Sequence, residues 1–216
     1  MRKERNGLLS MVLEPRATIQ STIKQSTIGY ILLLSFLATW ATNLLTSFQT
    51  YRYELIEDSF EYQTVFKELI TSALYSLGEV IFFLGVYAFI IWVIGKLFKG
   101  RGKFLELYKG ALLSMIPFII LLPILAIWLV VSSDSFYGMG EQSVIEIILL
   151  GIVLILTLLA VVISSVYSIV MVSEIHQISK WQAVFVLFIT MIIFTVLLVI
   201  VVLIIVIIFI VIEAMK

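Results

Sequence analysis

The sequence predicts an all-α, polytopic integral membrane protein with five transmembrane helices. Hydrophobic residues make up 62% of the 216-residue chain and charged residues 13%, and the mean hydropathy is +1.18. A soluble domain carries about 25% charged residues, so the composition excludes that class. The apolar residues also gather into five runs, each long enough for the roughly 20 residues that cross a hydrocarbon core of about 30 Å. These runs are Ile28 to Phe48, Ser72 to Ile94, Gly110 to Val131, Ser143 to Val172 and Ala183 to Ile212.

Charge distribution predicts the orientation. A basic leader, residues 1–27, precedes a single membrane domain, residues 28–216. The leader and the loops before the third and fifth runs together hold eleven Lys and Arg residues, against three on the other side. Because positive charges stay on the cytoplasmic side, we expect a cytoplasmic N-terminus and an external C-terminus in the cell membrane. The leader is either an amphipathic helix at the membrane surface or a solvated segment that only sets topology.

The segment between the first two runs, residues 49–71, is predicted to form an acidic amphipathic helix outside the membrane. Its carboxylates recur at helical spacing, and apolar side chains fill the opposite face. The acidic stripe consists of Glu54, Glu57, Asp58 and Glu61. Such a stripe is either a solvated face or an external contact for cations or cationic peptides, since like charges one turn apart repel.

Two carboxylates, Glu79 and Glu146, lie inside the predicted second and fourth spans. An ionisable group in a bilayer costs about 3 kcal/mol on insertion scales, which makes each a candidate for ion or proton coupling. Both lie within about two turns of the outer surface, where a carboxylate can also reach interfacial water or make a structural hydrogen bond.

Small and hydroxylated residues predict that the first, second and fourth spans form the bundle centre, because such residues let helices approach closely. They are Ser35, Thr39, Thr42 and Thr46 in the first span, Gly78 and Gly85 in the second, and Thr157, Ala160, Ser164 and Ser168 in the fourth. Pro117 and Pro123 are expected to kink the third span. The fifth, almost pure in Ile, Val, Leu and Phe, is expected to face lipid and to tilt or project.

A glycine-rich basic loop, Gly95 to Lys109, separates the second and third runs. Its candidate contacts for a cytoplasmic partner or for lipid are Lys96, Phe98, Lys99, Arg101, Lys103 and Phe104. Attraction to anionic headgroups, about 1 kcal/mol per cation near the surface, explains the charges without a protein partner. Headgroup attraction does not require the glycines or the apolar residues Leu97, Phe98 and Phe104, and these favour a protein contact.

Catalytic and cofactor motifs do not occur in the sequence. The only histidine, His176, lies in a short loop and there are no cysteines, which excludes a histidine-rich metal site, a thiolate site and a Ser-His pair at membrane depth. The chain has no H-E-x-x-H, Walker A or G-x-G-x-x-G pattern. We therefore expect no enzymatic activity, no cofactor, no metal and no nucleic-acid partner.

Three short segments resemble the Yip domain family. They are Glu14 to Thr18 before the first span, Gly95 to Gly100 with Phe104 and Tyr108 after the second, and Ser114 to Pro117 in the third. The resemblance runs from Met11 through the fifth span and implies a five-span protein with a cytoplasmic N-terminus. Eukaryotic members are implied to bind Rab-type GTPases through a long cytosolic segment. Here that segment has 27 residues and lacks an Asp-Leu-Tyr-Gly-Pro type motif, so GTPase binding is not carried over.

Two hypotheses for the function follow. The compact form resembles bacterial members of the family, some of which accompany ABC-type exporters in envelope defence. The favoured hypothesis is a non-enzymatic accessory or assembly subunit, with an ABC transporter as candidate partner, anionic lipid at its cytoplasmic face and the acidic stripe as external contact. The alternative is a small carrier or channel for ions or small solutes that uses Glu79 and Glu146.

Overall fold

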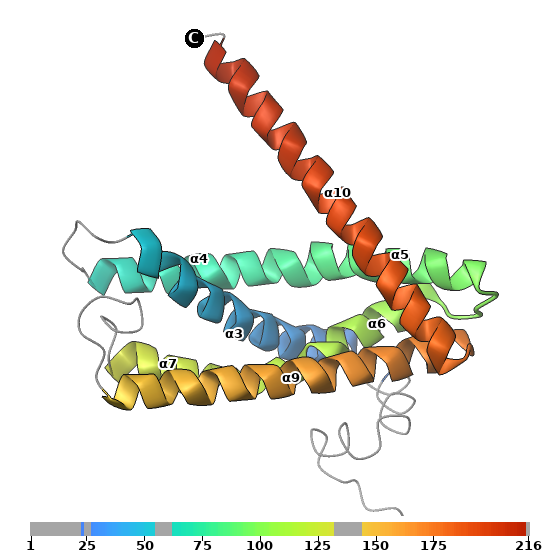
Figure 1. Ribbon diagram of the computed structural model, residues 1–216, viewed down its shortest axis with the longest axis horizontal. Helices are drawn as coiled ribbons and strands as arrows, with labels where there is room; N and C mark the ends of the chain where they lie inside the picture. Colours follow the sequence, from blue (N-terminus) through green and yellow to red (C-terminus); the bar gives the residue numbers. More distant parts are fainter. Residues whose placement is uncertain (1–22, 24–26, 55–61, 132–143, 215–216) are drawn as a thin grey trace, which may run out of the picture.

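The computed structural model describes residues 23, 27–54, 62–131 and 144–214, and in these ranges the chain is mostly helical, without a strand (Figure 1). The first span is α3 (Ile28–Glu54). The second combines α4 (Tyr62–Gly78), a π-helix η1 (Glu79–Phe83) and α5 (Leu84–Leu97). The third combines α6 (Phe104–Ser114), a 3-10 helix η2 (Ile116–Ile120) and α7 (Leu121–Val131). The fourth and fifth are α9 (Val144–His176) and α10 (Lys180–Ala214).

The prediction of five spans is confirmed. Five described helical stretches are long and apolar enough to cross a bilayer, namely Ile28–Thr46, Leu69–Leu97, Phe104–Trp128, Ile147–His176 and Lys180–Glu213. Two boundaries change the predicted sites. The third span begins at Phe104, so the second half of the predicted basic loop is helical and only residues 98–103 connect α5 to α6. The fourth begins directly after Glu146, which therefore lies at the edge of the span; its side chain is outside the described residues.

The third span lies at the centre of the bundle, where the sequence predicted the first, second and fourth. Helix α6 packs against α3, α5 and α9. The side chains of Leu107, Leu112 and Leu113 are at most 1% exposed. In the second span, by contrast, a Cβ added to Gly78 would meet no atom within 4 Å, so this glycine does not serve close packing. The small and hydroxylated residues of the first and fourth spans thus belong to helices that are neighbours of the central one.

The middle of the third span is not α-helical. Pro117 has no N–H, so it cannot continue the α-helical hydrogen bonding, and the backbone tightens into η2. There the Phe118 N–H donates to the Met115 carbonyl at 3.0 Å. Pro123 lies in the first turn of α7, a position that tolerates proline. The predicted irregularity is therefore confirmed at Pro117, and Pro123 falls just beyond it.

Two hydroxyl groups from neighbouring spans donate to backbone carbonyls in the last turn of α6, just before this break. Ser35 of α3 donates to the Leu112 carbonyl at 2.8 Å, and Ser164 of α9 donates to the Ser114 carbonyl at 2.7 Å. The Phe118 N–H, which would bond the Ser114 carbonyl in an α-helix, donates to the Met115 carbonyl instead, and in a bilayer a carbonyl left in this way needs another partner within the protein. The Leu112 carbonyl also accepts from the Met115 N–H, at 3.2 Å. The break therefore ties the first, third and fourth spans together.

We expect Ser164→Ala to lower the free energy of unfolding by about 0.6 to 1.7 kcal/mol, because it removes a hydrogen bond between helices at membrane depth. Ser165→Ala is the matched control, since Ser165 donates only to the Val161 carbonyl of its own helix, at 2.8 Å. Reversible unfolding of both variants in mixed mild-detergent and SDS micelles measures the difference. Equal losses would contradict the structural role of the cross-helix bond.

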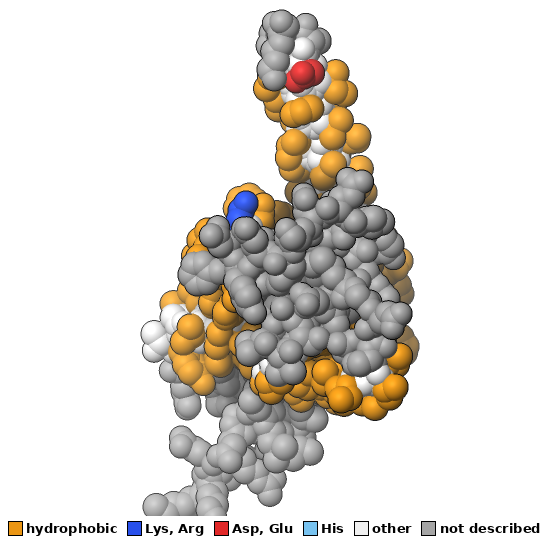
Figure 2. All heavy atoms as spheres, turned by 90° about the vertical axis from the view of Figure 1, so that its left-hand side faces the viewer, with side chains coloured by type: hydrophobic (Ala, Val, Ile, Leu, Met, Phe, Trp, Pro, Cys, Tyr) orange, Lys and Arg blue, Asp and Glu red, His pale blue; other side chains and the backbone are white. Residues whose placement is uncertain are grey.

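Helix α10 leaves the bundle. Figure 1 shows its C-terminal part projecting away from the other helices, and Figure 2 shows that part as a column covered largely by apolar side chains. The N-terminal part packs on α5 and α9, where Ala183, Val186 and Thr190 are buried. All residues from 199 to 213 are exposed. The sequence-based expectation of a projecting, lipid-facing last span agrees with this arrangement.

The acidic segment and the leader are described only in part. Residues 49–54 belong to the end of α3 and residues 62–71 to the start of α4, so the described parts of the segment extend two spans and do not form the separate helix that was predicted. Glu57, Asp58 and Glu61 lie outside the described residues, as does the Glu54 side chain. In the leader, Ile23 is buried and its carbonyl accepts a hydrogen bond from Lys109 Nζ at 3.3 Å.

Candidate functional site

The basic loop begins with a closed turn at the end of α5. The Lys99 N–H donates to the Lys96 carbonyl at 3.0 Å, and the Gly100 N–H donates to the Gly95 carbonyl at 2.9 Å. Lys99 has φ of 62°, so the pattern is a Schellman cap with lysine at the left-handed position where glycine is usual. A non-glycine residue there costs about 1–2 kcal/mol. The chain thus holds a lysine at a position where its backbone is strained.

The end of α9 has a similar cap, and the two caps are joined. Gln177 has φ of 57°, and the Ile178 N–H donates to the Ser173 carbonyl at 3.1 Å. The Arg101 N–H then donates to the His176 carbonyl at 3.0 Å. Residues from the connection between α5 and α6 are therefore bonded to the last residue of a helix more than seventy positions later in the chain.

The His176 side chain fills the space between three loop glycines. It is fully buried, and a Cβ built on Gly95 would overlap Nε2 of the ring, while one on Gly100 would overlap Nδ1. A Cβ on Gly102 would lie 3.0 Å from Nδ1. Only glycine allows the backbone to approach the ring so closely. We call Gly95, Gly100, Gly102 and His176 the clasp.

Packing holds the His176 ring in place. Neither ring nitrogen has a hydrogen-bond partner of good geometry among the described residues. No group of three His, Cys, Asp or Glu side chains in the described part of the chain could hold a metal ion. The clasp therefore has the features of a structural joint that fixes the shape of the loop. Sequence reasoning used His176 only to exclude a histidine-rich metal site and a Ser-His pair, although three glycines within eight residues were a visible sign of a close approach.

Outside the clasp, the loop exposes cations beside apolar side chains. The exposed cations are Lys96, Lys99, Arg101 and Lys103. Leu97 is 74% exposed and Phe104 39%. Phe98 is half-buried and packs against the hydrophobic core, so of the two predicted aromatic contacts only Phe104 is well exposed. We call Lys96, Leu97, Lys99, Arg101, Lys103 and Phe104 the loop surface; Leu97 was noted in the sequence beside the glycines but was not chosen as a candidate contact.

Aromatic contacts connect the loop surface to the second span. The Phe104 ring stacks on Tyr108, with centroids 6.2 Å apart, and meets Phe89 edge-on at 6.3 Å. The Tyr108 hydroxyl donates to the Val80 carbonyl at 3.1 Å, inside the π-helix η1. Phe104 therefore packs on both Phe89 and Tyr108 while part of its ring stays exposed.

A second polar cluster surrounds Glu79 at the start of η1. Asn43 Nδ2 of α3 donates to Ser76 Oγ at 2.8 Å and to Glu79 Oε2 at 3.1 Å. Glu79 is half-buried and lies ten residues inside the span that begins at Leu69, or about 15 Å along the helix. π-helical turns occur frequently at functional sites, but here Asn43 already gives the carboxylate a structural partner. The structure does not bring Glu79 and the loop surface together.

Comparisons with known proteins find one family. A family model described as the Yip1 domain matches residues 9–204, which is most of the chain. The comparisons with curated proteins and with solved structures each give no match.

Proposed function

The chain belongs to the Yip1 domain family, and from that premise we propose that this multi-pass membrane protein is a non-enzymatic accessory or assembly subunit of a larger membrane complex. In this proposal the loop surface binds a partner protein at the cytoplasmic face of the cell membrane. An ABC-type exporter is the partner class that the resemblance to compact bacterial members favours. The acidic segment around Glu57 is a second candidate contact, on the external face.

The observation that carries the proposal is the ordered shape of the loop. Cations alone would serve orientation, would attract headgroups, and would offset the negative ends of the α5 and α9 dipoles. None of these roles needs a fixed backbone. Nevertheless, three glycines and a buried histidine fix the backbone of this loop, and Lys99 lies at a strained backbone position. Strain that persists in a well-determined turn supports a functional role for the side chain it carries.

The apolar members of the loop surface support a protein contact. Leu97 and Phe104 project among cations at the end of the bundle, and protein interfaces combine apolar or aromatic anchors with a charged rim. Because the clasp fixes the positions of these anchors before binding, a partner need not order the loop, and less entropy is lost on association.

Purification in mild detergent, set beside a liposome flux assay, tests the proposal. We expect the tagged protein to retain a stoichiometric membrane-protein partner, and the lone protein in liposomes to show no flux of ions or small solutes. Clean purification without a partner, together with flux through the lone protein, would overturn the proposal and favour the carrier.

The carrier alternative rests on Glu79, a carboxylate at membrane depth and the first residue of the π-helix η1. Glu79→Gln keeps an oxygen that can accept from Asn43 but removes the titratable charge. If the protein is a coupled carrier, this variant should lose ion-driven uptake in liposomes while its thermal stability stays near that of the wild type. On the favoured proposal the variant retains its partner, and neither protein shows uptake.

A further inference from the structure

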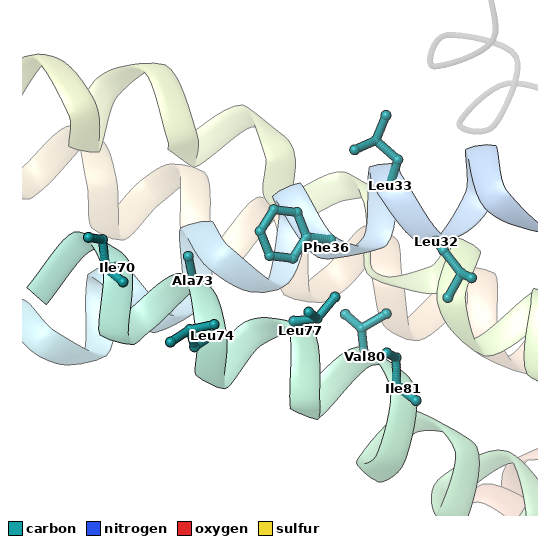
Figure 3. Close-up of a pocket in the computed structure, with 9 residues that line it drawn as sticks. All are labelled: Leu32, Leu33, Phe36, Ile70, Ala73, Leu74, Leu77, Val80 and Ile81. Carbon is teal, nitrogen blue, oxygen red and sulfur yellow. The ribbon is translucent and has the colours of Figure 1, made fainter.

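Two grooves border the first half of the second span, and they differ in one chemical respect. Figure 3 shows the first, about 400 Å³ in volume and lined by α3, α4 and η1, with side chains such as Phe36 and Leu77 on its walls. All of its lining residues are apolar, so lipid tails can cover it without recognition. The second, about 500 Å³, is lined by α4 and η1 alone and includes Glu79. We call it the carboxylate groove. Both volumes are in the range of small-molecule sites, about 300–1,000 Å³.

Glu79 lines this groove with one carboxylate oxygen that has no partner in the described part of the chain. Oε2 accepts the hydrogen bond from Asn43, a neutral amide, whereas Oε1 accepts none from a described residue and is not buried. No described Lys or Arg pairs with the carboxylate, and the nearest cation along the helix, Lys67, is about 18 Å away. A carboxylate without a charged partner is costly at membrane depth, and a cation in the groove would offset that cost.

The hollow depends on Gly78, which lines it without a side chain. The backbone of Gly78 has φ of −60° and ψ of −42°, which any residue adopts in a helix, and a Cβ added there would meet no atom within 4 Å. Neither backbone strain nor close helix packing therefore requires glycine at this position, although glycine destabilises a helix relative to alanine. Its effect is to leave open surface directly beside Glu79.

Aromatic side chains line the carboxylate groove together with Glu79. They are Tyr75 and Phe82, which are 71% and 66% exposed, and Phe83. The rings of Phe82 and Phe83 have centroids 5.7 Å apart and lie at 86° to each other, so they form a corner and not a flat stack. The face of an aromatic ring is negative and attracts a cation within about 6 Å of its centroid. A carboxylate beside such rings suits an organic cation, which is positive and apolar at once.

The depth of the groove restricts the ligand to a lipophilic one. The second span is 29 residues long, about 43 Å, which exceeds the hydrocarbon core by about 13 Å. Glu79 lies about 15 Å from the Leu69 end of the span. Even if the whole excess projected at that end, Glu79 would lie within the hydrocarbon layer. A metal ion would lose its water shell there, whereas an organic cation with apolar substituents can enter from the bilayer.

We propose that the carboxylate groove binds a lipophilic organic cation dissolved in the membrane, with its charge against Glu79 and its apolar groups on Tyr75 and Phe82. The carboxylate selects positive charge, and the aromatic walls select a bulky, weakly hydrated cation over a metal ion. The groove shares no residue with the clasp or the loop surface, so binding there does not depend on the partner protein. Binding also requires no transport, so its test is separate from the flux assay.

Equilibrium binding to the full chain in phosphatidylcholine vesicles tests this site. Two radiolabelled probes of the same shape are compared, the cation tetraphenylphosphonium and uncharged tetraphenylsilane, and binding to vesicles without protein is subtracted. For the wild type we expect saturable binding of the cation, about tenfold or more tighter than binding of the silane, because the carboxylate attracts only the cation. Glu79→Gln, which keeps an acceptor for Asn43, should remove this preference.

Three further variants separate binding in the groove from general adsorption. Gly78→Leu should fill the groove and abolish saturable binding of the cation, since the backbone and the space at this position allow a side chain. Phe82→Leu should weaken binding of the cation about threefold or more, the loss of one cation–π contact. Phe188→Leu is the matched control, because Phe188 is a similarly exposed aromatic residue on α10, and it should leave binding unchanged.

Equal affinity of the wild type for the phosphonium and the silane would overturn the proposal. A preference for the cation that survives Glu79→Gln, or saturable binding that survives Gly78→Leu, would also overturn it. An effect of Phe188→Leu as large as that of Phe82→Leu would show adsorption to exposed aromatic residues in general and would have the same consequence. Thermal unfolding of each variant separates lost binding from lost structure.

Discussion

Replacing Gly95 with alanine is expected to open the clasp and to destabilise the protein by about 1–3 kcal/mol, the usual cost of overpacking a filled site. The new methyl group would overlap the His176 ring, which is fully buried and cannot turn into solvent. Trypsin supplies a local measurement, because Lys96, Lys99 and Arg101 are cleavage sites on the exposed side of the turn. The wild type should resist cleavage there, and Gly95→Ala should be cut rapidly.

Removal of the ring should rescue that variant. His176→Ala alone leaves a cavity, but in the double variant with Gly95→Ala the clash is gone. The double variant should therefore lose less free energy of unfolding than the sum of the two single variants, by about 0.5–3 kcal/mol. Gly100→Ala is the matched control: its Cβ would also lie 2.7 Å from the Gly95 carbonyl oxygen, a backbone atom, so His176→Ala should not rescue it. If the losses of unfolding free energy in Gly95→Ala and His176→Ala add up in the double variant, the proposed contact between Gly95 and the His176 ring is contradicted.

The neighbours Leu97 and Phe98 should respond in opposite ways to truncation. Leu97 is 74% exposed, so Leu97→Ser should leave the unfolding temperature unchanged but reduce the amount of partner retained, by tenfold or more if Leu97 is an anchor of the kind that costs about 2 kcal/mol. Phe98→Ala should lower the unfolding temperature, because Phe98 packs on the core. Thermal unfolding and co-purification are measured on both. If Leu97→Ser retains as much partner as the wild type, Leu97 is not a contact for the partner.

Hydropathy and proline placement predicted most of the fold because both act locally. A run of about 20 apolar residues must cross the bilayer whatever surrounds it, and Pro117 lacks its N–H in any context. The serines on α3 and α9 were also visible in the sequence, since hydroxyls in apolar runs need partners. The central place of the third span was not predictable in this way. Its leucines occur on several sides of the helix, so no stripe distinguishes buried faces from lipid-facing ones.

The clasp could not be predicted, because it depends on contacts between distant parts of the chain. Gly95, Gly100 and Gly102 indicated a close backbone approach, but nothing in the local sequence identified His176 as the group that approaches. Likewise, Leu97 and Phe98 are adjacent apolar residues in a polar loop, and only the course of the cap decides which one faces the core. The sequence thus singled out the loop as a candidate contact, while the fold decides which of its apolar side chains are exposed.

The most direct measurement compares how much of the membrane-protein partner co-purifies with wild-type protein and with Gly95→Ala, at equal amounts in the membrane. Gly95→Ala keeps every cation of the loop surface but disturbs its shape. If the partner recognises the fixed loop, capture should fall sharply with Gly95→Ala and recover in the Gly95→Ala, His176→Ala double variant. Undiminished capture by Gly95→Ala would show that charge alone is recognised and would contradict the proposed role of the clasp.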